Sequence, residues 1–335
     1  MTGQTRAKGL TRRTAAAALL LAGAILPHQS QAADFVPAIV YATGAKFDKS
    51  FNEGAYNGAE RFKAETGIAY LEYQPQNPAE FERGVTALIR RGATQVAAIG
   101  FYYATPIKDL APKHPGVRFT LIDAVVDLPN VESITYKENE GAFLAGMLAA
   151  MASKSGRIGF IGAIDIPLIR KFSTGYEYGA HYVRPDAQVL LNFVGVTPAA
   201  FNDPTTASEV ARSQLIRGAD VLFAGAGLSN IGIFDAAKAQ GDLAIGVDAN
   251  QNGLYPGTIL TSQLKNVDTA VYESFMAGRE GFWRGGTREL GLKENGVGIV
   301  FDQYNAPLVT DDMRARIETA RNAIIDGQIV VPAHP

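Results

Sequence analysis

Hydrophobic runs of strand length recur along the chain and alternate with segments of helical pattern. In the helical segments, apolar residues return every three or four positions, as on one buried face of a helix. Such alternation is typical of βαβ units, in which parallel strands form a sheet that helices cover on both faces. We therefore predict an α/β protein with parallel sheets. The expected strands are 36–43, 95–99, 117–122, 157–161, 189–194, 221–224 and 243–247.

Local signals mark three of the helices. Asn77 precedes Pro78 and Glu80, which is the pattern of a cap, a first-turn proline and a capping-box acid. Asp203 and the proline after it open a second helix in the same way. Apolar residues from 143 to 151 predict a third helix with one buried stripe.

A short motif occurs twice and indicates a fold built from two similar halves. The pattern Phe-x-x-Gly-x-x-x-Gly-Ala stands at 51–59 and again at 172–180, each time after an expected strand. Glycines four apart share one helix face, so we expect them to let each helix approach its sheet closely. One expected strand in each half also ends in an acid, Asp123 and Asp248. We predict two Rossmann-like domains.

The carboxyl ends of the strands are the expected binding site. In open parallel sheets, ligands bind beyond these ends. Asp123, Asp248 and the glycine turns at Gly100 and 225–227 all follow expected strands. We therefore expect the strand ends of both domains to line a common cleft.

The chain must cross between the two domains, and we place crossings near Glu138 and Lys265. Closure about such crossings is a hinge motion that can enclose a small molecule. The predicted lobes are 33–138 plus about 266–292, and 139–265 plus about 293–330.

The N-terminal segment has the pattern of an export signal. Basic residues precede an apolar run at 15–26, and small residues then form a cleavage site after Ala32. The run has 12 residues, whereas a bilayer-spanning helix needs about 20. We predict a signal peptide at 1–32 and export to the periplasm, with no stable membrane insertion. Arg12 and Arg13 leave the Sec and twin-arginine routes both open.

The composition narrows the chemistry that the chain can perform. Lys and Arg number 31 against 33 Asp and Glu, so we expect no nucleic-acid partner, which would need a basic excess. The lack of cysteine excludes disulfides and thiolate chemistry, and the four histidines are scattered, so we expect no metal and no cofactor. No nucleophile elbow, Walker A sequence or G-x-G-x-x-G motif is present. We predict a protein that is not an enzyme, with an exported nucleoside hydrolase as the less favoured alternative.

Carboxylates and aromatic rings near the strand ends favour a flat ligand that carries hydroxyls. A buried carboxylate is costly unless a ligand supplies donors, and sugar hydroxyls can do so in hydrogen bonds worth about 1.5–3 kcal/mol each. Aromatic faces stack on a planar base for about 1–3 kcal/mol. The residues alone leave three ligand classes open: a nucleoside, a simple sugar, or another heteroaromatic compound such as a vitamin.

Several motifs resemble those of one known family. Asp-Lys-Ser-Phe-Asn at 48–52, with Ala-Tyr-Asn-Gly at 55–58, is similar to the signature of the basic membrane protein family, the substrate-binding proteins of ABC transporters. The segments 140–146, 246–251 and 261–265 also match the family's pattern, in the family's order. The resemblance implies a type I periplasmic-binding-protein fold with two hinged domains. It further implies a nucleoside ligand, with a purine favoured, and an ABC permease with its ATPase as partner. We expect a monomer.

The resemblance also implies roles for single residues. Tyr56 and Phe201 would stack on the base, Asp248 and Lys265 would bind the sugar hydroxyls, and Gly227 would bring the backbone close to the sugar.

The base end of the site is less well defined. Asp123 and the loop around Asp48 would line it, although Asp48 could instead cap the helix that follows. Purine-binding members often carry a polar residue before this Asp, and here the position is Phe47, which removes a hydrogen-bonding partner for the base. The identity of the base therefore stays open. Phe51 is expected in the core.

Many family members are lipoproteins, anchored through a cysteine at the cleavage site. Because this chain has no cysteine, we expect it to diffuse freely in the periplasm and not to be a lipoprotein. The sequence leaves open the affinity, the permease and the choice between transport and a sensory role.

Overall fold

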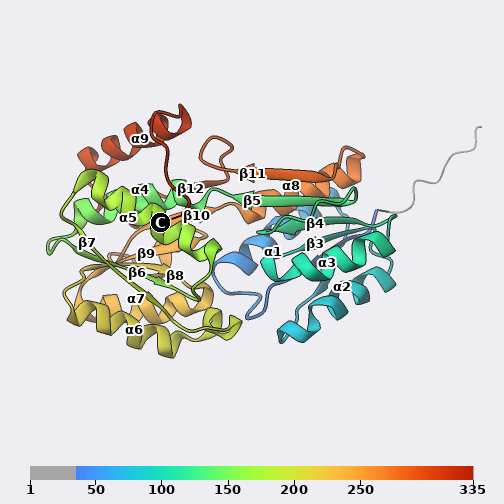
Figure 1. Ribbon diagram of the computed structural model, residues 1–335, viewed down its shortest axis with the longest axis horizontal. Coiled ribbons are helices and arrows are strands. Elements are labelled where there is room, and N and C mark those ends of the chain that lie inside the picture. The colour runs from blue at the N-terminus through green and yellow to red at the C-terminus, as the bar shows by residue number, and fades with distance from the viewer. Residues whose placement is uncertain (1–34, 335) are drawn as a thin grey trace, which may run out of the picture. The chain divides into compact units, whose positions relative to one another are not determined.

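The computed structural model describes residues 35–334, and the predicted signal peptide at 1–32 lies outside them. In the described chain, the strands form two six-stranded sheets (Figure 1). From edge to edge, the first sheet is β11 (Gly286–Leu290), β5 (Val131–Tyr136), β4 (Arg118–Ile122), β3 (Gln95–Ala98), β1 (Pro37–Val40) and β2 (Leu71–Tyr73). The second sheet is β12 (Val297–Ile299), β10 (Ile259–Lys265), β9 (Leu243–Asp248), β8 (Val221–Gly225), β6 (Arg157–Gly162) and β7 (Gln188–Phe193).

The two sheets repeat one topology. In each, the first strand lies between the second and the third, and the fourth and fifth continue the sheet on the far side of the third. All paired strands are parallel except β10 and β12. This is a doubly wound order with a switch point next to the first strand. The predicted α/β fold with two parallel sheets is confirmed.

Some strands are absent from the sequence prediction for a physical reason. β2, β11 and β12 lie at sheet edges. Edge strands are less buried than central ones, so their residues need not be apolar. β5 and β10 lie inside their sheets, but buried polar residues interrupt their apolar runs. In β10, for example, Thr261, Ser262 and Gln263 are all fully buried.

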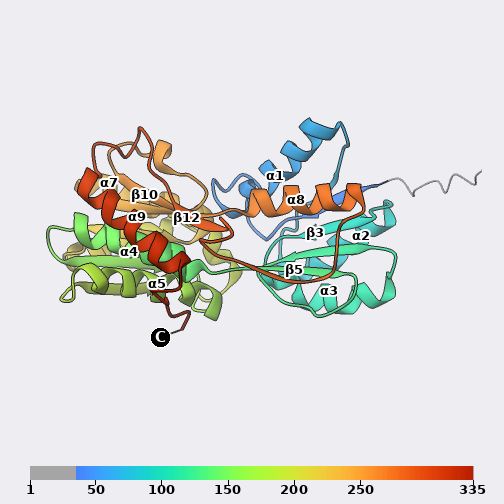
Figure 2. The same cartoon turned by 90° about the horizontal axis from the view of Figure 1, so that it is seen from above.

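Helices cover both faces of each sheet (Figures 1 and 2). On the first sheet α1 and α8 share one face and α2 and α3 the other, and on the second sheet α4 and α5 share one face and α6 and α7 the other. The helices are α1 (Phe51–Thr66), α2 (Phe81–Arg90), α3 (Ala104–Leu110), α4 (Glu138–Ala152), α5 (Pro167–Val183), α6 (Pro204–Ile216), α7 (Asn230–Gln240), α8 (Val267–Glu280) and α9 (Asp311–Ile325).

The predicted helix signals agree with the structure with two differences. Asp203 accepts a hydrogen bond from the Thr206 N–H at 3.0 Å and caps α6. Asn77 accepts one from the Ala79 N–H at 3.1 Å, but a short 3₁₀ turn, Pro78–Glu80, precedes α2. The helix predicted from the apolar residues at 143–151 is confirmed as α4, but it is buried nearly all round, between α5, α9 and the second sheet, rather than along one stripe.

Three of the four repeated glycines contact a neighbouring helix rather than a sheet, and Gly54 has open space beside it, so the predicted reason for their spacing is wrong. A Cβ added at Gly58 of α1 would collide with the backbone of Asp268 in α8. A Cβ at Gly179 of α5 would collide with the backbone of Phe143 in α4. The motif therefore lets α1 pack on α8 and α5 pack on α4 at close range.

Within the described chain, the backbone passes between the two sheets in three places. It leaves the first sheet between β5 and α4, at Glu138, and returns between β10 and α8, just after Lys265. It passes once more between β11 and β12. The lobe boundaries and the hinge motion stay predictions.

Candidate ligand-binding site

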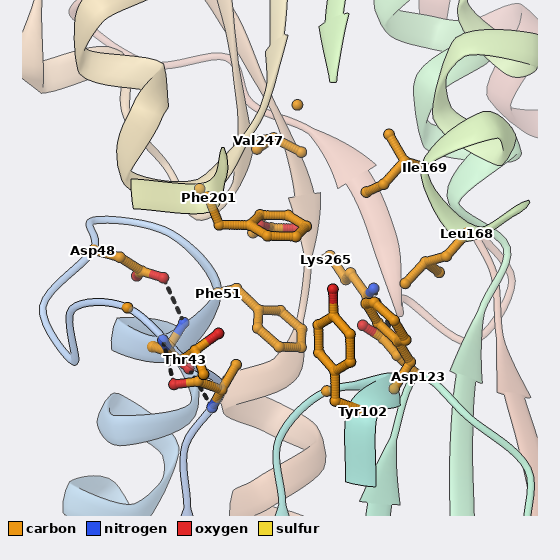
Figure 3. Close-up of a pocket in the computed structure, with 18 of the residues that line it drawn as sticks. Thr43, Asp48, Phe51, Tyr102, Asp123, Leu168, Ile169, Phe201, Val247 and Lys265 are labelled. Atoms are coloured by element: carbon orange, nitrogen blue, oxygen red, sulfur yellow. Dashed lines mark hydrogen bonds and ion pairs between the residues drawn. The ribbon is translucent and has the colours of Figure 1, made fainter. Parts of the chain in front are cut away.

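A cavity of about 80 Å³ lies at the carboxyl ends of strands from both sheets (Figure 3). In the first half, the turns after β1, β3 and β4 and the start of α1 contribute to its walls. In the second half, the walls come from the last residues of β8, β9 and β10, the turn after β8, the start of α5 after β6, and the 3₁₀ segment after β7. This volume holds several water-sized groups, which suits a small molecule. The lining residues are Ala42, Thr43, Gly44, Ala45, Asp48, Phe51, Asn52, Gly100, Phe101, Tyr102, Asp123, Leu168, Ile169, Phe172, Phe201, Gly225, Gly227, Val247, Asp248 and Lys265.

Aromatic rings form much of the cavity wall. Phe51, Tyr102 and Phe201 reach the cavity from three separate segments (Figure 3). Phe51 also packs against the core, where it was expected. Phe201 lies in the short 3₁₀ helix Pro198–Asn202, next to Gly227. Gly227 has a φ of 62°, and a Cβ there would come within 3.1 Å of the Phe201 carbonyl oxygen, so glycine lets the two turns approach.

The charged part of the cavity centres on Lys265 (Figure 3). Its Nζ lies 2.6 Å from Asp123 Oδ1 and 3.0 Å from Glu138 Oε1. Burial opposes the positive charge, but the carboxylates of Asp123, Glu138 and Asp248 outweigh it and raise the pKa of Lys265 above its ordinary value. Lys265 therefore stays protonated and acts as a donor only.

Asp123 and Asp248 occupy matching places in the two halves. Asp123 directly follows β4 and Asp248 is the last residue of β9, the fourth strand in each half, and both have a left-handed backbone, φ 70° and φ 66°. Asp248 Oδ2 accepts a hydrogen bond from the Ser50 hydroxyl at 2.7 Å, a contact between the two halves. Burial raises the pKa of Asp248 to about 6, although nearby Lys265 opposes this. A ligand that donates hydrogen bonds here would favour the ionised carboxylate.

The Asp48 carboxylate lines the cavity but is engaged by backbone. Its Oδ1 accepts from the N–H groups of Ser50 at 2.9 Å and Glu53 at 3.1 Å, and its Oδ2 accepts from that of Asn52 at 3.0 Å. These N–H groups lie at the start of α1, where helical partners are missing. The contacts are those of a helix cap, and a ligand contact by Asp48 stays a prediction.

Phe47 and Tyr56 are not among the residues that line the cavity. Their rings meet edge to face, 5.1 Å between centroids, and Lys46 Nζ lies 4.3 Å from the Tyr56 centroid in a cation–π contact. On α1, position 56 is turned about 140° from position 51, which faces the cavity. Phe51 and Tyr56 therefore face different sides of α1, and the rings of Phe47 and Tyr56 lie outside the cavity.

The lining residues that were not predicted include Phe101, Tyr102, Leu168 and Ile169. The first two directly follow the strand-end turn at Gly100, so the rule that placed the ligand at strand ends could have found them. Leu168 and Ile169 lie in the first turn of α5 and have the pattern of ordinary core residues.

A larger hollow of about 610 Å³ adjoins the cavity and shares Thr43, Gly44 and Ala45 with it. Its other walls are 75–78 on one side and 197–199 with Asn202 on the other. None of the residues that line it carries a charge.

Fold and site together define an α/β protein with a small-molecule cavity between two parallel sheets. Residues 35–334 match the family Bmp, described as ABC transporter substrate-binding protein PnrA-like, and the chain belongs to this family. The resemblance to the basic membrane protein family is confirmed. Membership implies a small-molecule ligand and a permease partner.

Relatives and a solved structure agree with this assignment. The chain is 32% identical over 301 residues to Basic membrane protein A2 of Borrelia garinii subsp. bavariensis, covering 88% of this chain and 87% of the relative. It is 37% identical over 276 residues to an uncharacterized lipoprotein of Pyrococcus horikoshii, covering 78% and 67%. A crystal structure of an ABC transporter solute-binding protein from Aeropyrum pernix K1 matches with a TM-score of 0.81 and 30% identity, covering 89% and 94%.

The predicted location is contradicted by these comparisons. Relatives from Pyrococcus species are named lipoproteins, against the expectation of a freely diffusing periplasmic protein that is not a lipoprotein. That expectation was based on the lack of cysteine, which concerns one type of covalent linkage and does not determine where a protein resides.

Among residues 35–334, no helix combines the length and apolar character that a bilayer span requires. In the same part of the chain, no three His, Asp or Glu side chains gather in a way that could hold a metal ion.

Proposed function

We propose that this chain binds a nucleoside, with a purine base favoured, and delivers it unchanged to an ABC permease. The observation that carries the proposal is the pairing, in one cavity, of aromatic rings with the Asp248 and Lys265 charges. A free sugar would leave the rings without a flat partner, and a heteroaromatic compound without vicinal hydroxyls would leave Asp248 without donors. A nucleoside satisfies both parts of the cavity.

The residues have distinct roles in this proposal. Phe201 stacks on the base, at about 1–3 kcal/mol for a ring on a base. Asp248 accepts from the sugar hydroxyls and Lys265 donates to them, while Gly227 keeps the backbone close to the sugar. Asp123 acts through Lys265, which it contacts at 2.6 Å, rather than on the base.

In this proposal, ligand binding changes the arrangement of the two halves. Contacts from both halves to one ligand stabilise the arrangement in which the halves enclose it, so ligand shifts the population toward that arrangement. The permease would recognise the enclosed form. We propose no reaction on the ligand, and incubation with inosine should release no hypoxanthine.

Calorimetry tests the ligand class. Ligand-free protein is titrated with guanosine, adenosine, ribose and riboflavin, and native mass spectrometry of protein purified without refolding identifies any retained ligand. We expect a nucleoside to bind and free ribose not to bind. We also expect riboflavin not to bind, because its hydroxyls lie on an open, flexible chain rather than on a sugar ring and its three fused rings are larger than a purine. Binding of ribose alone would exclude the aromatic part of the proposal, and release of hypoxanthine from inosine would favour the hydrolase.

A pair of variants tests the stacking residue. Phe201→Ala should weaken nucleoside binding by about 5- to 150-fold, the equivalent of one lost stack. Tyr56→Ala is the matched control, because its ring contacts Lys46 and lies outside the cavity. Affinity within threefold of the parent is expected for Tyr56→Ala, and equal losses in both variants would contradict the proposal.

A further inference from the structure

Glu138 is a buried carboxylate beside the cavity that does not line it. Its side chain is fully buried, and both oxygens face a lysine. Oε1 lies 3.0 Å from Lys265 Nζ, and Oε2 lies 3.3 Å from Lys171 Nζ of α5. Glu138 begins α4 immediately after the chain leaves the first sheet.

The geometry of Lys265 makes this position important. An ammonium group has three N–H donors and no acceptor. Asp123 and Glu138 lie 2.6 and 3.0 Å from Nζ as ion-pair partners rather than in hydrogen-bonding alignment, and together they fix the place of the ammonium at the wall of the cavity that Lys265 lines. The rings of Phe51 and Tyr136 lie 5.3 and 5.0 Å from Nζ and limit its movement on other sides.

Lys171 holds Glu138 in place from the second half. Its Nζ donates to the Tyr136 carbonyl oxygen at 2.9 Å and pairs with Glu138 at 3.3 Å. Glu138 thus has a cation on each oxygen, and both the carboxylate and the end of β5 are fixed. With Glu138 gone, Asp123 would be the one remaining carboxylate of the described chain in an ion pair with the Lys265 ammonium.

We infer that Glu138 is a positioning residue for ligand recognition, which holds the Lys265 ammonium where it can donate to a ligand hydroxyl and links that contact to the two chain crossings. The inference rests on the proposed function only in naming the ligand group as a hydroxyl. Glu138 lies at one crossing and Lys265 directly before the other. A ligand that contacts Lys265 is therefore connected, through the ion pair with Glu138, to both crossings.

The central variant is Glu138→Gln, measured with a ribonucleoside that the parent binds and with its 2′,3′-dideoxy analogue. We expect the variant to lose at least tenfold in affinity for the ribonucleoside and less than threefold for the analogue, which offers no such hydroxyls. Equal losses for both ligands would mean a general structural role and would overturn the inference.

Three further variants separate positioning from folding. Glu132→Gln is the matched control, because Glu132 is also a buried carboxylate in an ion pair, 3.0 Å from Arg288, and does not line the cavity. It should not change the ratio of the affinity for the ribonucleoside to the affinity for the dideoxy analogue, which Glu138→Gln is expected to lower. Glu138→Asp keeps the charge and should restore part of the ratio. Lys171→Met, at a partly exposed side chain, should lower the ratio in the same direction even where Glu138→Gln does not fold.

A measurement without ligand keeps the outcome independent of the proposed function. The ¹⁵Nζ resonance of the buried Lys265 ammonium, assigned by its loss in Lys265→Met, should shift or exchange faster with water in Glu138→Gln or Lys171→Met. It should be unchanged in Glu132→Gln. If the parent binds no nucleoside, the proposed function fails while this resonance still decides the role of Glu138. An unchanged resonance in both Glu138→Gln and Lys171→Met would refute it.

Discussion

At the scale of single residues, the Asp248 carboxylate favours ligand binding but lowers the stability of the ligand-free protein. Burial raises the pKa of this carboxyl from 3.8 to about 6, so its ionised form disfavours the folded ligand-free protein. A group whose folded pKa is raised contributes stability below its unfolded pKa and loses that contribution as the pH rises through the folded pKa. The loss therefore falls between about pH 4 and pH 6 and amounts to at most about 3 kcal/mol at pH 7.

Asp248→Asn imitates the protonated carboxyl and should stabilise the ligand-free protein at pH 7 by about 1–3 kcal/mol in the free energy of unfolding. The advantage should shrink as the pH falls through 6 and vanish near pH 4, while nucleoside affinity falls. Denaturant unfolding at pH 4, 5.5 and 7 measures this. Asp165→Asn is the control, because Asp165 is exposed and its pKa is lowered by Arg170. A stability advantage for Asp248→Asn that stays constant with pH would refute the explanation.

At the scale of elements, the two copies of the glycine motif differ at one matching position. Gly54 in α1 has open space where a Cβ would lie, whereas a Cβ at Gly175 in α5 would collide with the backbone of Asn139 in α4. Gly54→Ala should therefore stabilise the protein by about 0.5–1 kcal/mol, the helix-propensity difference. Gly175→Ala should destabilise it by about 1–3 kcal/mol through overpacking. Thermal and denaturant unfolding measure both, and a Gly175→Ala variant as stable as the parent would contradict the helix contact.

These elements also show what a sequence can predict here. Strand ends follow from local pattern, so Asp123 and Asp248 were placed near a ligand site, whereas Lys265 ends the unpredicted strand β10 and was assigned to the ligand only through the family resemblance. The structure brings all three to one cavity. Which face of a helix meets which partner depends on packing between distant segments. For that reason the sequence assigned the glycines to the sheet and placed Tyr56 at the ligand. Lys171 and Glu138 form an ion pair because α5 packs on α4. A contact of this kind between distant segments cannot be predicted from a local sequence pattern.

At the scale of the whole described chain, contacts between the halves are uneven around the cavity. Near Asp248 the halves already touch, through Ser50 and through a hydrogen bond of 3.0 Å from the Gln251 amide to the Lys49 carbonyl oxygen. At the hollow of about 610 Å³, loops 75–78 and 197–199 of the two halves leave uncharged space between them. Further enclosure of a ligand would therefore take place at the hollow.

Nucleoside binding should make the protein more compact and should protect the loops of the hollow. We expect a smaller radius of gyration in small-angle scattering, because closure by hinge motion brings the halves together at their open side. Amide hydrogen exchange at 43–45 and 197–202 should slow with ligand, since these segments line the hollow. Exchange at β11, an edge strand with exposed residues that do not line the hollow, should not change and serves as the internal control. An unchanged radius and unchanged exchange at saturating nucleoside would mean that the ligand binds without closure, and recognition by the permease would then have to depend on something other than shape.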